Sequence, residues 1–270
     1  MAPKDDICEH LEGARAIAVE AGRKILDVYE RGFSVEHKED RSPLTEADRA
    51  AHDLIAARLA RLTPDIPLLS EESAKIEYAE RARWRRFWLV DPLDGTKEFI
   101  NRNGEFTVNI ALIEDHAPVL GVVYVPVPGV VYFACRGRGA FKHKSLAAPE
   151  PIRARGFAGG KPIVVASRSH AGAETEAFLQ SLGPHDVVSM GSALKLCLVA
   201  EGAADVYPRL GPTMEWDTAA AQCVVEAAGG RVTDVSRRPL TYNKESLLNP
   251  WFLASGADDY DWARHVPPRN

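Results

Sequence analysis

Two aspartates three residues apart follow a short apolar run in the segment Trp88–Lys97, whose sequence is WLVDPLDGTK. Asp91 and Asp94 are expected to project from one tight turn, and such oxygen ligands suit a hard cation such as Mg²⁺. Gly95 lets the backbone approach a phosphate, and a helix that begins near Thr96 offers free N–H groups to the same anion. The alternative is an ordinary turn built on an Asp-Gly pair.

Three more acidic residues stand where they could join this pair. Glu71 follows the short apolar stretch 66–69, Asp217 begins a helical pattern, and Asp48 lies three residues after Thr45. Each has a simpler explanation by itself: a charged pair in solvent for Glu71, a favourable interaction with the helix dipole for Asp217, and a variant of the capping box for Asp48. The motifs must therefore be judged together.

The second half of the chain supplies cationic and hydroxyl groups. They stand in the segments Ser167–His170 (SRSH), Gly191–Lys195 (GSALK) and Tyr207–Arg209 (YPR). Ser192 and Lys195 bracket the expected start of a helix. That is a suitable place for a second phosphate, although plain helix capping uses the same pattern.

Motifs of other enzyme classes are absent. The chain has no G-x-x-x-x-G-K-[ST] phosphate loop, no G-x-G-x-x-G after a strand and no G-x-S-x-G elbow. His170 lacks a histidine four residues later and a cysteine partner, so zinc chemistry and nucleophilic catalysis have little support. Carboxylates with a divalent cation are left as the best available catalytic apparatus.

The composition is that of a globular protein that does not bind a nucleic acid polymer. Of 270 residues, 33 are Lys or Arg and 38 are Asp or Glu, which gives a net charge of −5. No run approaches the roughly 18 apolar residues of a membrane span, and the first residues lack the apolar stretch of a signal peptide, so we expect a cytoplasmic protein. Cys8, Cys135, Cys197 and Cys223 are scattered without a C-x-x-C pair, which predicts free thiols in a reducing compartment.

Hydrophobic spacing predicts the elements that must position these side chains. Apolar residues at helical spacing predict helices over Ile7–Val28 and Thr45–Leu62, with a polar loop over 36–43 between them. Strands are expected from apolar runs, the last three of them as an antiparallel meander. These strands are 87–90, 106–113, 119–125 and 130–134.

Beyond a stretch rich in Pro, Gly and Ala over 147–162, strands and helices alternate, which is typical of an α/β unit. The expected strands are 163–166, 187–189, 205–207 and 231–233, and the expected helices are 174–182, 193–201 and 216–228. We therefore predict two domains, an N-terminal α+β unit over 1–155 and a C-terminal α/β unit over 156–270.

Taken in order, several of these motifs resemble those of the inositol monophosphatase superfamily. They are Leu44–Asp48 (LTEAD), Leu69–Glu72 (LSEE), Trp88–Thr96 (WLVDPLDGT) and Trp216–Ala220 (WDTAA). Three further segments resemble one group in that superfamily, the bacterial 3′(2′),5′-bisphosphate nucleotidases of the CysQ type. These are Thr96–Asn109, Ala166–His170 and Gly191–Gly202. The resemblance covers nearly the whole chain, from Leu11 to Phe252.

The resemblance implies the fold and the metal ligands. The fold is a five-layer α-β-α-β-α sandwich, with the active site between an N-terminal α+β half and a C-terminal α/β half. Glu71, Asp91 and the carbonyl of Leu93 would hold one Mg²⁺, and Asp91, Asp94 and Asp217 would hold a second. A third, weaker ion is expected near Glu71, so two to three Mg²⁺ ions are implied.

The resemblance also assigns catalytic and substrate-binding residues. The Thr96 hydroxyl, paired with Asp48, would orient and help deprotonate the attacking water, with Glu71 assisting. Ala193 stands where a second serine is usual, which affects one minor hydrogen bond and not the class. The residues expected to bind the substrate are Gly95, Thr96, Ser192, Lys195, Arg209 and Asp217.

The implied activity is hydrolysis of the 3′-phosphate of adenosine 3′,5′-bisphosphate (PAP) to AMP and phosphate, which would clear an inhibitor of sulfate activation. The alternative is an inositol-1-monophosphatase or a related sugar phosphatase. A nucleotide sensor without catalysis is a third hypothesis, which is disfavoured because the metal ligands and the water-activating pair are all present. Inhibition by lithium is expected with this family. The sequence leaves open whether the chain is a monomer or a homodimer and whether it associates peripherally with the inner membrane.

Overall fold

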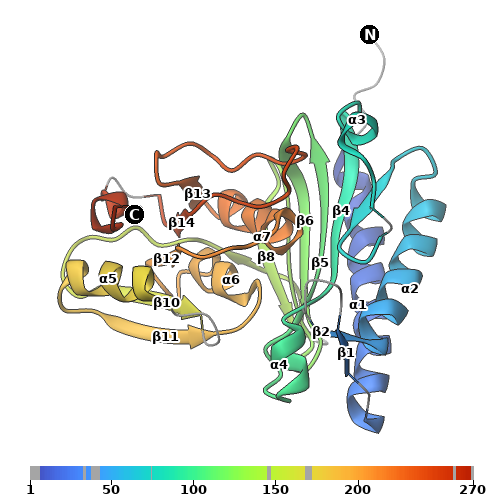
Figure 1. Cartoon of the computed structure of the whole chain (residues 1–270), viewed down its shortest axis with the longest axis horizontal. Coiled ribbons are helices and arrows are strands. Elements are labelled where there is room, and N and C mark those ends of the chain that lie inside the picture. The colour runs from blue at the N-terminus through green and yellow to red at the C-terminus, as the bar shows by residue number, and fades with distance from the viewer. Residues whose placement is uncertain are drawn as a thin grey trace.

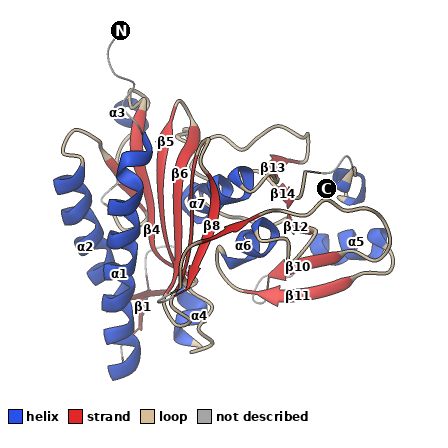
Figure 2. Cartoon of the chain, turned by 180° about the vertical axis from the view of Figure 1, so that it is seen from behind, coloured by secondary structure: helices blue, strands red, loops and turns tan. Residues whose placement is uncertain are grey.

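A computed structural model of the chain describes residues 7–32, 35–37, 43–73, 75–144, 147–167, 172–257 and 260–268. Its helices and sheets form five layers (Figure 1, and from behind in Figure 2). α1 (Leu11–Arg31) and α2 (Glu46–Leu62) cover one face of a seven-stranded sheet, and α6 (Leu194–Ala200) and α7 (Glu215–Ala227) lie between that sheet and a five-stranded one. α5 (Ala173–Leu182) lies on the outer face of the five-stranded sheet. The predicted α-β-α-β-α order is confirmed.

The seven-stranded sheet runs in the order β3-β4-β5-β6-β7-β8-β9. Its strands are β3 (Leu68–Ser70), β4 (Arg86–Asp94), β5 (Thr107–Glu114), β6 (Ala117–Val125), β7 (Val130–Cys135), β8 (Gly139–Lys144) and β9 (Glu150–Ile152). β3 is parallel to β4, and the later pairs are antiparallel, which confirms the meander over β5, β6 and β7. β8 and β9 are not among the predicted strands, because most of their side chains are partly or fully exposed and they lack an apolar run.

Strand β4 is buried on both faces, and its side chains alternate between two cores. Trp88 and Val90 pack in the cluster that includes α1 and α2, whereas Phe87 and Leu89 pack in the cluster that includes α6 and α7. A strand buried on both faces has a continuous apolar sequence, and a slip of one residue would exchange the two sets of side chains. This packing therefore fixes the place at which Asp91 follows the apolar run.

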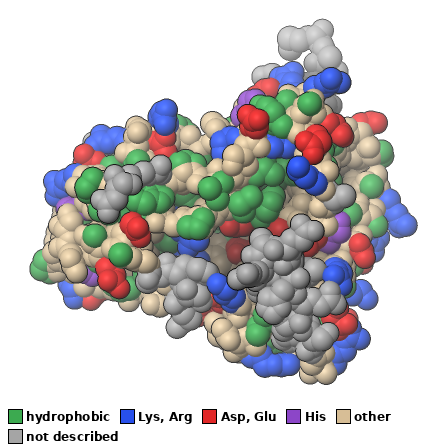
Figure 3. All heavy atoms as spheres, in the orientation of Figure 1, with side chains coloured by type: hydrophobic (Ala, Val, Ile, Leu, Met, Phe, Trp, Pro, Cys, Tyr) green, Lys and Arg blue, Asp and Glu red, His purple; other side chains and the backbone are tan. Residues whose placement is uncertain are grey.

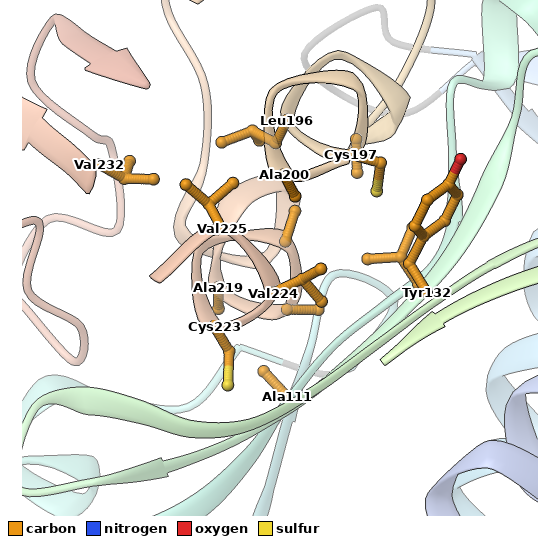
Figure 4. Packing of buried hydrophobic residues seen from close by; sticks show 14 of the residues in the cluster. Ala111, Tyr132, Leu196, Cys197, Ala200, Ala219, Cys223, Val224, Val225 and Val232 are labelled. Atoms are coloured by element: carbon orange, nitrogen blue, oxygen red, sulfur yellow. The ribbon is translucent and has the colours of Figure 1, made fainter. Parts of the chain in front are cut away.

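Helix α7 packs directly on the seven-stranded sheet. A Cβ atom added at Gly121 of β6 would lie 2.2 Å from the carbonyl oxygen of Ala220, so only glycine allows this approach. Figure 4 shows Cys223 and Val224 of α7 on the side that faces Ala111 of β5. Because α7 also carries a predicted metal ligand, the packing ties the position of that ligand to the sheet.

The five-stranded sheet has the order β11-β10-β12-β14-β13. Its strands are β10 (Ile163–Ser167), β11 (Asp186–Met190), β12 (Val206–Arg209), β13 (Arg231–Asp234) and β14 (Phe252–Ser255). β10 pairs in parallel with β11 and β12, and β14 pairs in antiparallel fashion with β12 and β13. The alternation of strands and helices predicted for the second half is confirmed, while the short strand β14 is not among the predicted elements.

Several short elements complete the chain. β1 (Val35–His37) and β2 (Pro43–Thr45) form a two-stranded antiparallel ribbon ahead of α2. The predicted polar loop over 36–43 is therefore wrong at both ends, because strands this short leave no periodicity to detect, and residues 38–42 lie outside the described residues. The remaining elements are η1 (Ile7–His10), α3 (Tyr78–Arg81), α4 (Thr96–Ile100) and η2 (Trp262–His265). None of the described helices combines the length and the apolar character that crossing a membrane requires.

The prediction that all four cysteines are free thiols is wrong for two of them. Cys8 and Cys135 form a disulfide with their Cα atoms 5.7 Å apart, while Cys197 and Cys223 are buried free thiols. The prediction of four free thiols is therefore wrong for the first pair, and the cysteines no longer argue for a reducing compartment. The paired cysteines are 127 residues apart in the sequence, and no local spacing signals such a pairing.

Candidate active site

Glu71 and Asp91 follow neighbouring parallel strands at one edge of the sheet. β3 and β4 pair with Ser70 opposite Val90, and the N–H of Glu71 donates to the carbonyl of Val90 at 3.1 Å. Since the ends of two parallel strands lie at the same edge, the two acidic residues are brought together there. Asp91 is 2% exposed, and its Oδ1 accepts a hydrogen bond from the N–H of Leu93 at 3.1 Å.

A break in the β4–β5 register turns Asp94 toward the second half of the chain. The pairing shifts between Asp91 and Asp94, and an irregularity of this kind re-aims a side chain. Oδ2 of Asp94 accepts a hydrogen bond from the N–H of Ala193 at 2.6 Å and one from the side-chain amide of Asn109 at 3.1 Å. The next residue, Gly95, has φ of +92°, a left-handed conformation that favours glycine. Asp94 thus joins the two halves of the chain.

Asp217 is held in the first turn of α7. Its Oδ2 accepts a hydrogen bond from the N–H of Met214 at 2.9 Å, which is one of the two bonds of a capping box. Two residues earlier, the fully buried Glu215 accepts hydrogen bonds from the N–H groups of Asn243 and Lys244. The helix-start explanation of Asp217 is therefore correct, and it is compatible with a role as a ligand because capping occupies only one carboxylate oxygen.

Asp48 and Thr96 meet in the N-terminal half. Oδ2 of Asp48 accepts hydrogen bonds from the N–H and the hydroxyl of Thr45 at 2.8 and 2.6 Å, so the predicted capping box is present. Oδ1 of Asp48 lies 3.4 Å from the hydroxyl of Thr96. That hydroxyl also lies 3.4 Å from the carbonyl oxygen of Leu93. The cap thus fixes the carboxylate so that its second oxygen faces the predicted partner.

Most of the predicted site residues line one cavity of about 290 Å³. Figure 3 shows acidic side chains, in red, in the hollow at the middle of the drawn face, with basic side chains, in blue, beside them. The predicted residues that line the cavity are Glu71, Asp94, Gly95, Thr96, Ser192, Lys195, Arg209 and Asp217. Asp48, Asp91 and Leu93 do not line it and are buried.

The carboxylates raise one another's pKa values. Burial, followed by the charges of Glu71 and Asp94, holds the pKa of Asp91 well above its usual range. Burial, followed by the charge of Asp94, raises the pKa of Asp217 to about 8. Burial also raises the pKa of Asp94, although the charge of Lys195 opposes this effect. Like charges gathered in a buried cleft disfavour ionisation unless a cation is present.

The donor set fits a hard divalent cation but is not a closed coordination shell. Carboxylate and carbonyl oxygens are the ligands that Mg²⁺ takes, and a bound cation would relieve the repulsion that raises these pKa values. In the part of the chain that the structure describes, no three His, Cys, Asp or Glu side chains are arranged to hold an ion as they stand. Ion binding and closure of the site are therefore expected to be coupled.

Lys195 and Arg209 give the cavity its cationic side. Lys195 is buried, and its Nζ donates to the carbonyl of Ser192 at 2.7 Å. Burial lowers the pKa of Lys195 to about 8, although the charge of Asp94 opposes this effect. Ser192 has φ of +45°, a conformation that strains a residue other than glycine and that is found at functional sites. An anion in the cavity would keep Lys195 protonated.

Two residues at the site, Asn109 and Thr213, were not predicted from the sequence. Asn109, from β5, donates to Asp94, and Thr213 lines the cavity. A buried amide in an apolar strand is the only signal that could have singled out Asn109, and nothing in the sequence singles out Thr213. Of the predicted segment Ser167–His170, Ser167 lines the cavity, while residues 168–170 lie outside the described residues.

The model of the inositol monophosphatase family matches residues 6–256 of this chain. The chain belongs to the inositol monophosphatase family. A curated relative, the 3′(2′),5′-bisphosphate nucleotidase CysQ of Escherichia coli O6:H1, is 51% identical over 93% of this chain and 98% of its own length. Members of this family are metal-dependent phosphatases, so the resemblance drawn from the motifs is confirmed.

Solved structures of the inositol monophosphatase family share the fold. The crystal structure of CysQ from Bacteroides thetaiotaomicron has 46% sequence identity and a TM-score of 0.82, and the match covers 93% of this chain and 98% of that one. SuhB from Bartonella henselae has 25% identity and a TM-score of 0.81 over 95% of this chain and 98% of its own. The five-layer architecture is thus that of the family.

The raised pKa values predict that Mg²⁺ stabilises this family member more at high pH. A carboxylate whose pKa is higher in the folded than in the unfolded state contributes stability that is present below the unfolded value and lost as the pH rises through the folded value. For Asp217 this stability is lost over the pH range from about 4 to about 8. Because Mg²⁺ competes with these protons, it should raise Tm more at about pH 9 than at about pH 6.

Thermal unfolding followed by circular dichroism measures this difference. NaCl at matched ionic strength is the control, since general screening of charge would give the same rise with either salt. An equal rise in Tm at the two pH values would contradict the assignment of the buried carboxylates as ligands.

Proposed function

We propose that the chain is a Mg²⁺-dependent phosphatase that hydrolyses the 3′-phosphate of PAP to AMP and phosphate. The observation that carries this proposal is that an acidic cluster shares one cavity with Lys195 and Arg209. A nucleotide with two phosphates can offer one of them to bound cations and the other to the basic side chains. The name of the 51% identical relative describes such a substrate.

The cation ligands come from separate elements that the fold holds together. Glu71, Asp91, Asp94, Asp217 and the carbonyl of Leu93 would hold two to three Mg²⁺ ions. When bound, these ions supply positive charge for the phosphate and for the attacking and leaving oxygens, and they make water easier to deprotonate. The protein fixes the ligands through the ends of β3 and β4, the irregularity in β4 and the first turn of α7.

Thr96 and Asp48 would position the attacking water. The Thr96 hydroxyl can accept a hydrogen bond from the water while it donates to Oδ1 of Asp48, 3.4 Å away. Asp48 cannot turn away, because Thr45 holds its other oxygen. Oδ1 of Asp48 would take the proton that the Thr96 hydroxyl relays from the water. Glu71 would assist from the same cavity.

The second half of the chain would bind the nucleotide. Lys195 and Arg209 offer charge to the second phosphate, and Ser192 offers a hydroxyl at the start of α6. Gly95 would let the backbone approach the scissile phosphate. A plain inositol monophosphate has only hydroxyl groups to present to these basic residues, which is why the inositol phosphatase alternative is not favoured.

A comparison of two substrates tests the proposal. With Mg²⁺ present, kcat/KM for PAP should exceed kcat/KM for inositol 1-phosphate by at least about tenfold, because the inositol ester leaves the basic side chains without a partner. Phosphate release measures both rates, and a chelator followed by excess Mg²⁺ checks that the activity depends on the cation. A preference for the inositol ester would contradict the substrate assignment.

Other features of the chain remain part of this proposal. We place it in the cytoplasm as a monomer or a homodimer, with the domain boundary between residues 155 and 156.

Lithium is expected to inhibit it, because a small monovalent ion can occupy a Mg²⁺ position without matching its charge. Peripheral association with the inner membrane would be tested by fractionation.

A further inference from the structure

One segment of the cavity wall carries two polar groups without a partner. Nε of Arg209 and Oγ1 of Thr213 are buried side-chain atoms that form no hydrogen bond. Both residues line the cavity that holds the acidic cluster. Buried polar groups are almost always paired, and one that lacks a partner costs free energy. Two of them on the segment 209–213 therefore require an explanation.

The segment 209–213 is anchored at other atoms. The terminal Nη2 of Arg209 donates to the carbonyl of Pro212 at 2.5 Å. The carbonyl of Thr213 accepts a hydrogen bond from the N–H of Asn249 at 2.9 Å. These bonds hold the guanidinium and the backbone beside the cavity, and they leave Nε and Oγ1 for another partner.

The charges around this segment indicate an anion. Lys195 and Arg209 face the same cavity, and the charge of Arg209 helps to lower the pKa of Lys195, although burial is the larger cause. Two cations that line one cavity repel each other, and an anion between them turns this repulsion into attraction. A phosphate oxygen can also accept hydrogen bonds from a guanidinium N–H and from a hydroxyl.

We propose that Thr213 is a specificity-determining residue, which binds the second phosphate of the substrate together with Arg209. This proposal rests on the proposed function, since it names a contact to the phosphate that is not hydrolysed. Arg209 supplies charge, and the Thr213 hydroxyl supplies a directed hydrogen bond. One phosphate would satisfy both unpartnered atoms.

Two substitutions at Thr213 separate the hydroxyl from the shape of the side chain. Thr213→Val keeps the shape and removes the hydroxyl, whereas Thr213→Ser keeps the hydroxyl. The measured quantity is the ratio of kcat/KM for PAP to kcat/KM for adenosine 3′-monophosphate, which lacks the second phosphate. We expect Thr213→Val to lower this ratio about tenfold, mainly through KM for PAP, because it removes a hydrogen bond to a charged group. Thr213→Ser should restore most of the ratio.

The control is Thr241→Val, which changes an exposed threonine in the same way and should leave the ratio as it is. An equal loss with both substrates would overturn the proposal, because the hydroxyl would then contact the ribose or support the structure. An unchanged ratio for Thr213→Val would overturn it as well.

Binding of AMP keeps this test independent of catalysis. Calorimetry should show that Thr213→Val weakens binding of AMP, which carries the 5′-phosphate, about tenfold more than binding of adenosine. If the unsubstituted protein hydrolysed neither nucleotide, the proposed function would fail while this measurement still decided the role of Thr213. Equal weakening of AMP and adenosine would count against the phosphate contact.

Discussion

Asp94→Asn is expected to lower kcat/KM for PAP by at least about 10³-fold while the protein stays folded. Asparagine keeps an oxygen for the N–H of Ala193, which now donates to Asp94 at 2.6 Å. It removes the negative charge that a cation needs, while the oxygen that it keeps can also accept the hydrogen bond from the side-chain amide of Asn109, which now goes to the same Oδ2. Phosphate release at saturating Mg²⁺ measures the loss.

The fold should tolerate this change. The charge of Asp94 is one cause of the raised pKa of Asp217, so its removal relieves repulsion and Tm without Mg²⁺ should not fall. Asp53→Asn is the matched control, because it makes the same change on the exposed face of α2, and it should alter activity by less than about twofold. Undiminished turnover of Asp94→Asn would refute the assignment of Asp94 as a ligand.

Thr96→Val is expected to lower kcat about 10²-fold or more, because valine can neither accept a hydrogen bond from water nor donate one to Asp48. Asp48→Asn should cause a loss of similar size. Asparagine can still accept a hydrogen bond from Thr45, so the cap of α2 is kept. The measurement is kcat for PAP at saturating Mg²⁺ and saturating substrate.

The double variant tests whether Thr96 and Asp48 act as one unit. Residues that act together lose activity non-additively, so Thr96→Val combined with Asp48→Asn should be little worse than either single change. Thr96→Ser retains the hydroxyl and should keep most of the activity. Independent, multiplicative losses would show that the 3.4 Å contact between these residues does not serve a shared proton path.

Much of the fold follows from local pattern. The apolar run that ends at Asp91 correctly predicts a buried strand, because β4 is packed on both faces. The periodic apolar residues of α1 and α2 correctly predict helices, because each helix buries one face on the sheet. The order of the five layers came from the resemblance, since it depends on long-range pairings such as that of β12 with β14.

Three of the missed features leave no periodic or apolar signal in the sequence. The disulfide between Cys8 and Cys135 and the ribbon of β1 and β2 depend on where distant or very short segments meet, and neither leaves a periodic signal. β8 lacks an apolar run because most of its side chains are partly exposed. A pattern that reports burial cannot reveal elements that bury little.

The candidate site was predictable only as a set of motifs. Asp217 is the clearest case, because its capping bond to Met214 alone explains an aspartate at that position. The structure shows that the same residue also lines one cavity with Glu71 and Asp94, and that burial and the charges of these two residues raise its pKa. The proposed role of Thr213 could not be predicted from the sequence. It is inferred from a buried hydroxyl that lacks a hydrogen-bond partner, and only the structure shows this.

Carboxylates from separate elements are proposed to close around divalent cations in this cavity. Crystals grown with Mn²⁺, which takes similar oxygen ligands and scatters anomalously, test this proposal most directly. Two to three anomalous peaks are expected, each about 2.0–2.3 Å from oxygens of Glu71, Asp91, Leu93, Asp94 or Asp217. An active, Mn²⁺-loaded enzyme with no peak among these residues, or with its peaks elsewhere, would contradict it.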